Sequence, residues 1–272
     1  SQVWTNNVQG VKCNTQTSTG SFENCQDVST GEVDVAVATS DVVLNAYNGT
    51  GKFADIGKLD NLRVIGAVYT SVLSGVALKS SGLTYIHELL GKRVAVGPAA
   101  SATENATLAA FDVMGIDSSN TSLENLGLGD GADSVGDGIL DAAFGFAGLP
   151  IGGQLNLAAT KEIQVLDMTQ EEIDKVLAGN AAYIQTKIPA GTYTGQDNDA
   201  NTFGVKCLII VTADMDADLV YDLCKAMNEH TEELAAGNAL LKDMTDPSFL
   251  CTQMPIPLHD GAQKYYSEQG LI

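Results

Sequence analysis

Short apolar runs alternate along the chain with longer segments in which apolar residues recur every three or four positions. The short runs predict β-strands and the longer segments predict helices, and their alternation is typical of α/β layers with parallel strands. No tandem repeat is visible, which excludes a solenoid. The predicted strands cover residues 11–16, 33–38, 62–69, 75–79, 93–97, 141–146, 163–166 and 204–212. The predicted helices cover residues 21–29, 40–47, 85–90, 103–114, 131–139, 151–157, 170–177, 217–235, 246–250 and 259–268.

The two halves of this pattern echo one another. Each half contains a loop of small or hydroxyl-bearing residues, then a helix, then a strand entered through a Gly-x-x-Asp turn. The loop and turn fall at 19–21 and 31–34 in the first half, and at 100–103 and 138–141 in the second. The echo predicts two similar α/β lobes.

Two long β-runs mark where the chain passes between these lobes. The runs at 72–79 and 204–212 bracket a complete α/β segment, which ends in a loop at 188–202 rich in Pro, Gly, Asn and Asp. Such a loop interrupts regular structure, and the bracketing is expected when one lobe is inserted into the other. We therefore predict that residues 1–78 and 206–272 form the first lobe and residues 79–205 the second.

The charge of the chain excludes several partners. It has 272 residues and a net charge of -20, with only 14 basic residues, of which two are arginines. Nucleic acid requires clustered Lys and Arg, and none occur, so we predict no nucleic-acid partner. An anionic membrane surface is disfavoured for the same reason. No apolar run approaches the ~18–20 residues of a membrane span.

Cysteine and histidine give no sign of a metal or catalytic centre. The chain has five cysteines but no C-x-x-C motif. Cys13 and Cys25 could form a disulfide, or all five could be buried free thiols, and the sequence leaves both open. His87, His230 and His259 are far apart, and neither G-x-S-x-G nor H-E-x-x-H occurs. We predict no metal, no cofactor and no catalytic residues.

The first candidate binding loop is GPAASATE, which follows the predicted strand at 93–97. Ser101 with Glu104 three residues later predicts a capping box and an exposed helix N-terminus. The backbone N–H groups there, including those at Ala102 and Thr103, and the helix dipole suit an anion. A capped helix without a ligand is the alternative. No Gly-Lys-Ser/Thr follows, so this is not a Walker loop.

Three weaker candidates follow other predicted strands. Thr19, Gly20 and Ser21 offer hydroxyl and amide donors at a helix start, and Ser40 opens the next helix in the same way. Helix capping is the simpler interpretation of both segments. In FGFAGLP, Phe144 could cover a ligand and Gly148 could allow close approach, although a core position for Phe144 is an equal alternative. Loops at the carboxyl ends of strands are where α/β proteins bind ligands.

Five stretches together resemble one family, the TAXI-type solute receptors of TRAP (tripartite ATP-independent periplasmic) transporters. They lie at residues 19–53, 90–104, 141–150, 188–197 and 254–270, in the family's order, and cover nearly all of the chain. The motifs AYNGTG, IPAGTY-x-GQD and PIPLH-x-GA-x-x-YY are specific in combination.

The resemblance implies a type II periplasmic-binding-protein fold, with two α/β lobes, a two-strand hinge and a ligand cleft between the lobes. It also implies a monomeric, non-enzymatic receptor outside the cytoplasm, periplasmic or secreted, with a lipid anchor as one option and a signal peptide removed. Such receptors deliver a small solute to the membrane subunits of an ion-driven transporter, and characterised relatives bind small carboxylates, including acidic amino acids. The predicted ligand-binding residues are Thr19, Gly20, Ser21, Ser40, Ser101, Ala102, Thr103, Phe144, Gly148 and Tyr193, the last from the IPAGTY motif.

The sequence departs from the family in two places. The strand and Gly/Thr/Tyr-rich loop with which the family usually opens are missing, so we expect part of the site to lie outside this sequence. The usual Gly-Ser-Gly-Thr reads Ala100-Ser101-Ala102-Thr103, and the added methyl groups narrow access to the backbone. Two other functions remain open: a sensory receptor for a membrane signalling partner, and an enzyme on the same fold.

Overall fold

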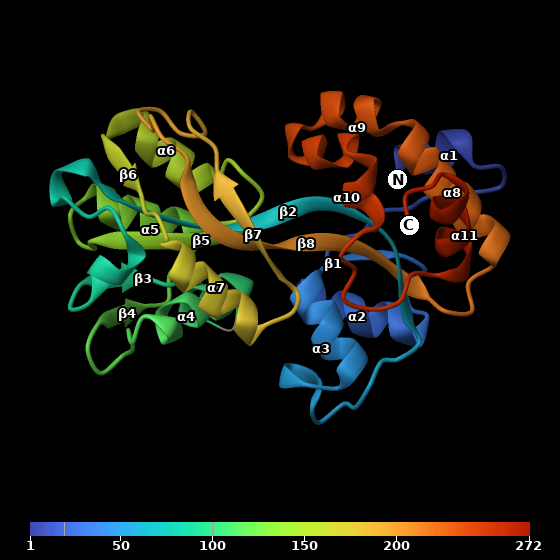
Figure 1. Ribbon diagram of the computed structural model, residues 1–272, viewed down its shortest axis with the longest axis horizontal. Helices are drawn as coiled ribbons and strands as arrows, with labels where there is room; N and C mark the ends of the chain where they lie inside the picture. Colours follow the sequence, from blue (N-terminus) through green and yellow to red (C-terminus); the bar gives the residue numbers. More distant parts are fainter. Residues whose placement is uncertain (19, 100) are drawn as a thin grey trace. The chain divides into compact units, whose positions relative to one another are not determined.

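The computed structural model describes residues 1–18, 20–99 and 101–272. The chain divides into two compact units, the first formed by Ser1–Thr70 with Val205–Ile272 and the second by Ser71–Gly204. Two long strands, β2 (Leu62–Leu78) and β8 (Ala200–Thr212), carry the chain from one unit to the other (Figure 1). The first crossing therefore falls inside a continuous strand, where the sequence pattern predicts two separate strands.

The strands of the first unit have a different core on each face. Side chains alternate along a strand, so Val64 of β2 joins the core beneath the early helices while Ile65 joins the core beneath the late ones. The same alternation separates Leu208 from Ile209 in β8. Strand β1 (Ala36–Thr39) pairs antiparallel with β8, which in turn neighbours β2.

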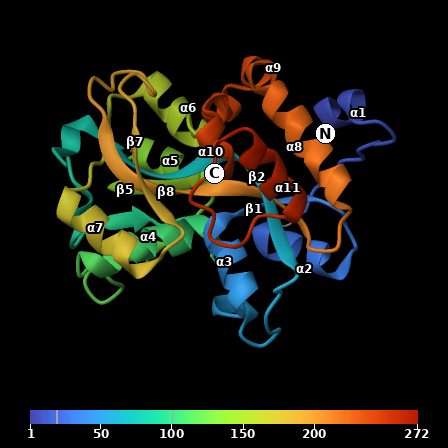
Figure 2. The ribbon, with the colours of Figure 1, turned by 45° about the vertical axis from the view of Figure 1, so that its right-hand side comes forward.

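Seven α-helices surround these strands in the described part of the first unit. Helix α8 buries Val220, Leu223 and Met227 along one stripe, at the spacing of an amphipathic helix. The Trp4 indole N–H donates to the Leu223 carbonyl oxygen at 3.0 Å, so α1 lies against α8 (Figures 1 and 2). The helices are α1 (Gln2–Asn7), α2 (Ser21–Thr30), α3 (Ser40–Asn48), α8 (Ala217–Glu229), α9 (Thr231–Gly237), α10 (Pro247–Cys251) and α11 (Asp260–Glu268).

The second unit is built around β5 (Ala142–Ala147). This strand pairs antiparallel with β2, from Val72↔Ala147 to Val76↔Ala143, and parallel with β3 (Arg93–Ala95). The remaining elements are β4 (Ser122–Glu124), parallel to β3; β6 (Ile163–Val165), antiparallel to β2; β7 (Tyr183–Ile188), beside β8; and helices α4 (Ala102–Val113), α5 (Leu128–Gly136), α6 (Gly152–Thr160) and α7 (Gln170–Gly179).

Helices cover both faces of β5. Ala143 belongs to the core that contains Ala132 and Val135 of α5. Phe144, the next residue, packs edge-on against Phe111 of α4, with ring centroids 5.4 Å apart. Consecutive residues of β5 therefore separate α5 from α4, which lie on opposite sides of the strand in Figures 1 and 2.

Several predicted elements differ from those observed. Residues 11–16 form no strand, because polar side chains occupy both faces and most of them are exposed. The helix predicted at 217–235 is two helices, separated at His230. The segment at 85–90 is a short 3-10 helix, η3 (Ile86–Leu89). Strands β4 and β7 were not predicted, and both carry exposed polar residues that weaken the apolar pattern.

All five cysteines lie within the described ranges, and the structure holds them as free thiols, including Cys13 and Cys25. Of the two arrangements that the sequence leaves open, the structure therefore has the unpaired one. None of the helices in the described part of the chain is both long and apolar enough to cross a membrane.

Candidate functional site

In the first unit, a polar cluster forms where the N-termini of α2 and α3 meet. Thr39 ends β1 and caps α3, and its backbone N–H donates to Ser21 Oγ at 3.1 Å. The two hydroxyl oxygens are 3.4 Å apart. Gly20, at φ 137°, caps α2 in a conformation that favours glycine. Gly20 and Ser21 therefore lie at a helix start, as predicted, and Thr19 lies outside the described residues.

Asp41 is the least satisfied member of this cluster. It lies in the first turn of α3 and is only 8% exposed. Its carboxyl group interacts with the Thr39 hydroxyl and with the backbone N–H groups of Asp41 and Val42, yet Oδ1 has no hydrogen-bond partner among the described residues. Burial raises the pKa of this carboxyl, and these hydrogen bonds oppose the rise.

Asp41 lies among buried residues. Burial, together with the negative charge of Asp41, raises the pKa of the Cys25 thiol to about 12. Cys25 is fully buried in the core beneath α2 and α3. Ser40 is 3% exposed. Its contact with a ligand remains a prediction. The sequence offered one signal for Asp41, an acidic residue in a helix's first turn, but no pattern reveals that one oxygen lacks a donor.

In the second unit, Ser101 caps α4 as predicted, but the Glu104 side chain bonds Asn125 and not the Ser101 backbone. Ser101 Oγ accepts from the Glu104 backbone N–H at 3.1 Å. The Ser101 N–H donates to Pro98 O at 3.1 Å, and Glu104 Oε1 accepts from Asn125 Nδ2 at 2.7 Å. The predicted capping box is therefore only half formed, because the Ser101 N–H donates to Pro98 O and Asn125 donates to the Glu104 carboxylate.

Thr103 joins this loop to the end of β5. Its Oγ1 accepts from the Phe146 backbone N–H at 3.2 Å, and the residue is 5% exposed. Gly97, at φ 98°, permits this packing, because a Cβ there would lie 2.5 Å from Thr103 Cγ2. Since β3 and β5 are parallel, Ser101, Thr103 and the half-buried Gly148 follow the carboxyl ends of neighbouring strands. This is the edge at which α/β sheets bind ligands.

Two predicted site residues of this unit lie in the core. Phe144 is 2% exposed and packs on Phe111. The Tyr193 hydroxyl donates to Gln154 Oε1 at 2.8 Å and accepts from the Ile151 N–H at 3.1 Å. Tyr193 is 1% exposed, and burial raises its pKa. Both side chains thus have structural roles here, and their contact with a ligand remains untested.

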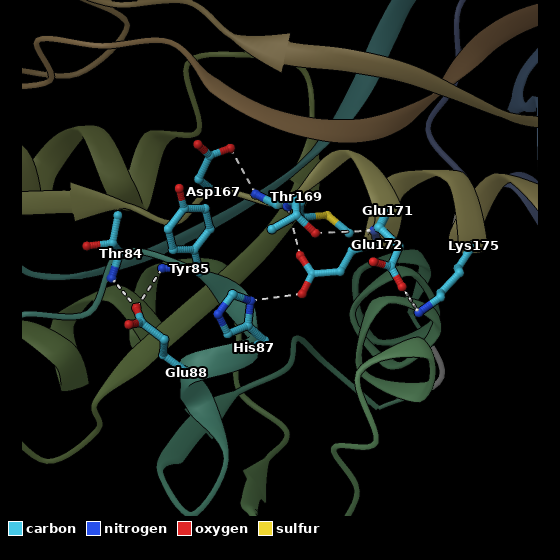
Figure 3. A network of polar contacts seen from close by, with 10 residues as sticks. Thr84, Tyr85, His87, Glu88, Asp167, Thr169, Glu171, Glu172 and Lys175 are labelled. Carbon is cyan, nitrogen blue, oxygen red and sulfur yellow. Dashed lines mark hydrogen bonds and ion pairs between the residues drawn. The ribbon is translucent and has the colours of Figure 1, made fainter.

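A second polar network links η3 to α7 (Figure 3). His87 Nδ1 lies 2.8 Å from Glu172 Oε1, while Glu172 Oε2 accepts from the Thr169 N–H at 2.8 Å. Glu88 Oε2 accepts from the backbone of Thr84 and Tyr85 on the opposite side. Within the described ranges, no three His, Cys, Asp or Glu side chains gather as a metal ion would require.

Two surface hollows lie in the second unit. One, of about 410 Å³, is lined at the ends of α5 and α6 by residues that include Asp133, Asp137 and Lys161. The other, of about 340 Å³, is lined by residues that include Lys79 and Thr194. Neither hollow is lined by a predicted ligand-binding residue within the part of the chain that the structure describes.

The architecture is that of a type II periplasmic substrate-binding protein, which confirms the predicted fold class. The chain belongs to the NMT1-like family, whose model matches residues 1–270. The fold is shared with the periplasmic aliphatic sulphonate binding protein SsuA of Escherichia coli, at TM-score 0.54 and 12% identity over 98% of this chain and 76% of that chain. The alkanesulfonate-binding protein SsuA of Xanthomonas axonopodis pv. citri, bound to MOPS, gives 0.52 and 13% over the same shares. A TctC solute binding protein from Polaromonas gives 0.51 and 15%, over 90% and 82% of the two chains.

Proposed function

We propose that the protein is a solute-binding receptor that works outside the cytoplasm and delivers a small carboxylate to a TRAP-type secondary transporter. Three considerations support this proposal: the NMT1-like family, the fold shared with solute-binding proteins, and the motifs that resemble TAXI-type receptors. Two of the similar structures are those of sulfonate-binding proteins. A sulfonate, like a carboxylate, is a compact oxyanion.

The observation that carries the proposal is the loop at the start of α4. Helix geometry leaves the first N–H groups of α4 without partners inside the helix, and the dipole favours negative charge there. Ser101 and Thr103 add hydroxyl groups at the same edge, beside the end of β5. The chain has only two arginines, and Arg93 is already engaged by Asp141. Hydroxyls and helix N–H groups are therefore the proposed anion ligands.

The remaining features of the proposal follow from the same resemblance. The two compact units serve as the lobes of the receptor, and β2 and β8 serve as its hinge. In the first unit, Gly20 and Ser21 are the proposed solute contacts. The receptor acts as a monomer, uses no cofactor, does not transform its solute, and hands it to membrane subunits driven by an ion gradient.

Calorimetric titration of matched variants tests the binding role of the α4 loop. The panel consists of propionate, succinate, glutarate, L-alanine, L-aspartate and L-glutamate. We expect Ser101→Ala to weaken the best carboxylate by about ten- to a hundred-fold, as expected for loss of a hydrogen bond to a charged group. Ser119→Ala, an exposed serine of the same unit, is the control. Unchanged affinity in Ser101→Ala, with stability lowered by about 1 kcal/mol, would show that Ser101 only caps α4.

Uptake measurements test the transport partner. The receptor and candidate TRAP membrane subunits are reconstituted in liposomes with labelled solute. We expect uptake that needs the receptor and an ion gradient but not ATP. Uptake that needs ATP would contradict the TRAP assignment. So would a solute that the receptor binds but the reconstituted membrane subunits do not transport.

A further inference from the structure

We propose that Tyr69 is a specificity-determining residue of the solute site, and that its hydroxyl group donates a hydrogen bond to the carboxylate of the solute. The sequence motifs do not single out this residue. The inference rests on the proposed solute-binding function and adds a contact from β2 to it. It concerns one group of neighbouring side chains inside the first unit, formed by Ser21, Thr39, Tyr69 and Cys207.

Tyr69 lies where β2 becomes accessible. Every residue of this strand from Val64 to Ala77 is buried, except that three consecutive residues, Val68, Tyr69 and Thr70, are half-buried. Core residues cover both faces of β2 in the first unit, so three half-buried residues in a row mark a place where that cover ends. The first unit itself ends at Thr70. This stretch therefore gives a solute access to the strand.

The accessible stretch lies at the edge of the sheet where α/β proteins bind ligands. In the first unit the strands are neighbours in the order β1, β8, β2 (Figure 1). Strand β8 is antiparallel to β1, and it enters the first unit where β2 leaves it, so β1 and β2 run in the same direction. Thr39, which ends β1, and Tyr69 therefore both lie at carboxyl ends of strands.

Contacts across these three strands connect Tyr69 to a predicted ligand-binding residue. The Tyr69 hydroxyl group hydrogen-bonds the Cys207 thiol of β8. Cys207 is paired with Thr39 in the register of β1 and β8, and the Thr39 N–H donates to Ser21 Oγ at 3.1 Å. The Tyr69 side chain and the start of α2 therefore belong to one connected group of polar side chains.

The Tyr69 hydroxyl is available as a hydrogen-bond donor. Burial is the main cause that raises the pKa of Tyr69, and the Cys207 thiol adds to the rise, so the hydroxyl keeps its proton near neutral pH. A thiol is a weak partner, both as donor and as acceptor. A hydrogen bond to a carboxylate is roughly twice as strong as one between neutral groups. A solute carboxylate would therefore replace Cys207 as the partner of the Tyr69 hydroxyl.

Tyr69 is the residue of the accessible stretch best suited to contact a solute. The Thr70 hydroxyl already donates to Asp243 Oδ2 at 3.0 Å, and Val68 packs against the core that contains Ile65. The Tyr69 ring supplies apolar surface next to its hydroxyl. One residue can thus contact both the carboxylate and the carbon chain of a small acid, which is why we assign it a role in specificity.

The competing explanation is that Tyr69 only packs in the strand and holds Cys207. Tyr69→Phe separates the two explanations, because it removes the hydroxyl and keeps the ring. A solute contact would lose affinity and keep stability, since without solute the hydroxyl bonds only a weak partner. A structural residue would lose stability alone. Cys207→Ala removes the thiol and keeps the phenol, so it reports any effect transmitted through the contact between these two residues.

The test is calorimetric titration with propionate, succinate, glutarate, L-alanine, L-aspartate and L-glutamate. We expect Tyr69→Phe to weaken the acid that the wild type binds most tightly by about ten- to a hundred-fold. The unfolding midpoint of the solute-free variant should be unchanged. Cys207→Ala should keep its affinity within about threefold of wild type. Tyr47→Phe, which alters a half-buried tyrosine of α3 in the same unit, should behave as wild type.

Failure of this inference differs from failure of the proposed function. If the wild type binds one of the acids and Tyr69→Phe binds it equally well, Tyr69 is not a solute contact and the receptor function stands. An equal loss of affinity in Cys207→Ala would also overturn the inference, because the effect would then come from the contact between the strands. Binding of none of the six acids by the wild type would overturn the proposed solute class, and this inference with it.

Discussion

The Tyr193 hydroxyl donates to Gln154 Oε1 at 2.8 Å, which ties the long loop between β7 and β8 to helix α6. Gln154 is fastened in turn to Ser74 of β2, since Ser74 Oγ donates to Gln154 Oε1 at 2.6 Å and Gln154 Nε2 donates to Ser74 O at 2.8 Å. All three residues are buried. The loop motif that contains Tyr193 is thus held by a polar network in the core of the second unit.

We expect Tyr193→Phe to lower the free energy of unfolding by about 1–3 kcal/mol, because it leaves the buried Ile151 N–H without its acceptor. Urea unfolding monitored by circular dichroism measures this change. Solute affinity should stay within twofold. A loss of affinity without a loss of stability would instead make Tyr193 a ligand contact, as the sequence predicts.

Lys206 provides a second test of the core, in the first unit. Its ammonium donates to the carbonyl oxygens of Phe249 at 2.9 Å and Thr252 at 2.8 Å, and burial lowers its pKa. Lys206→Met keeps a side chain of similar length but removes the N–H donors. We expect it to lower the free energy of unfolding by about 1–3 kcal/mol. Chemical denaturation provides the measurement, with the exposed Lys58→Met as control. Equal stability of both variants would show that the two carbonyl groups find other donors.

The ion pair between Arg93 and Asp141 predicts a pH dependence. Arg93 Nη2 and Nε lie 2.9 and 3.2 Å from the two carboxylate oxygens, and the Arg93 N–H donates at 2.8 Å. The Arg93 side chain is the main cause that lowers the pKa of Asp141 in the folded protein. The pair therefore stabilises the fold above the ordinary Asp pKa, and the contribution is lost as the pH falls through the lower, folded value.

We expect Asp141→Asn to cost about 1 kcal/mol or less at pH 7, since both side chains are partly exposed to solvent. The difference from wild type should shrink as the pH falls below about 4, where the unfolded Asp becomes protonated. Thermal unfolding across pH 3–7 measures it. A difference that grows toward low pH would contradict the sign of this linkage.

Much of the fold was predictable because its elements have simple local signals. Ser101 caps α4 as its sequence indicates, and short apolar runs locate β5 and β8, and β2 as two shorter strands. The strand predicted at 11–16 fails because polar side chains occupy both of its faces and most of them are exposed. The other half of the capping box does not form, since the Ser101 N–H donates to Pro98 O and Glu104 accepts from Asn125, which is distant in sequence.

The candidate site was predictable as a set of loops but not in its chemistry. Gly20, Ser21 and Ser101 stand at helix starts because small and hydroxyl-bearing residues have a strong local preference there. The burial of Tyr193 and the unpaired oxygen of Asp41 depend on contacts between segments far apart in the chain. Neither follows from spacing or composition.

The small molecule retained by the purified protein tests the central claim most directly. The protein is purified without added solute, denatured, and its released small molecules are identified and quantified by mass spectrometry. A receptor of the proposed kind should release one small carboxylate per chain. A retained molecule that is purely cationic or wholly apolar would contradict the account.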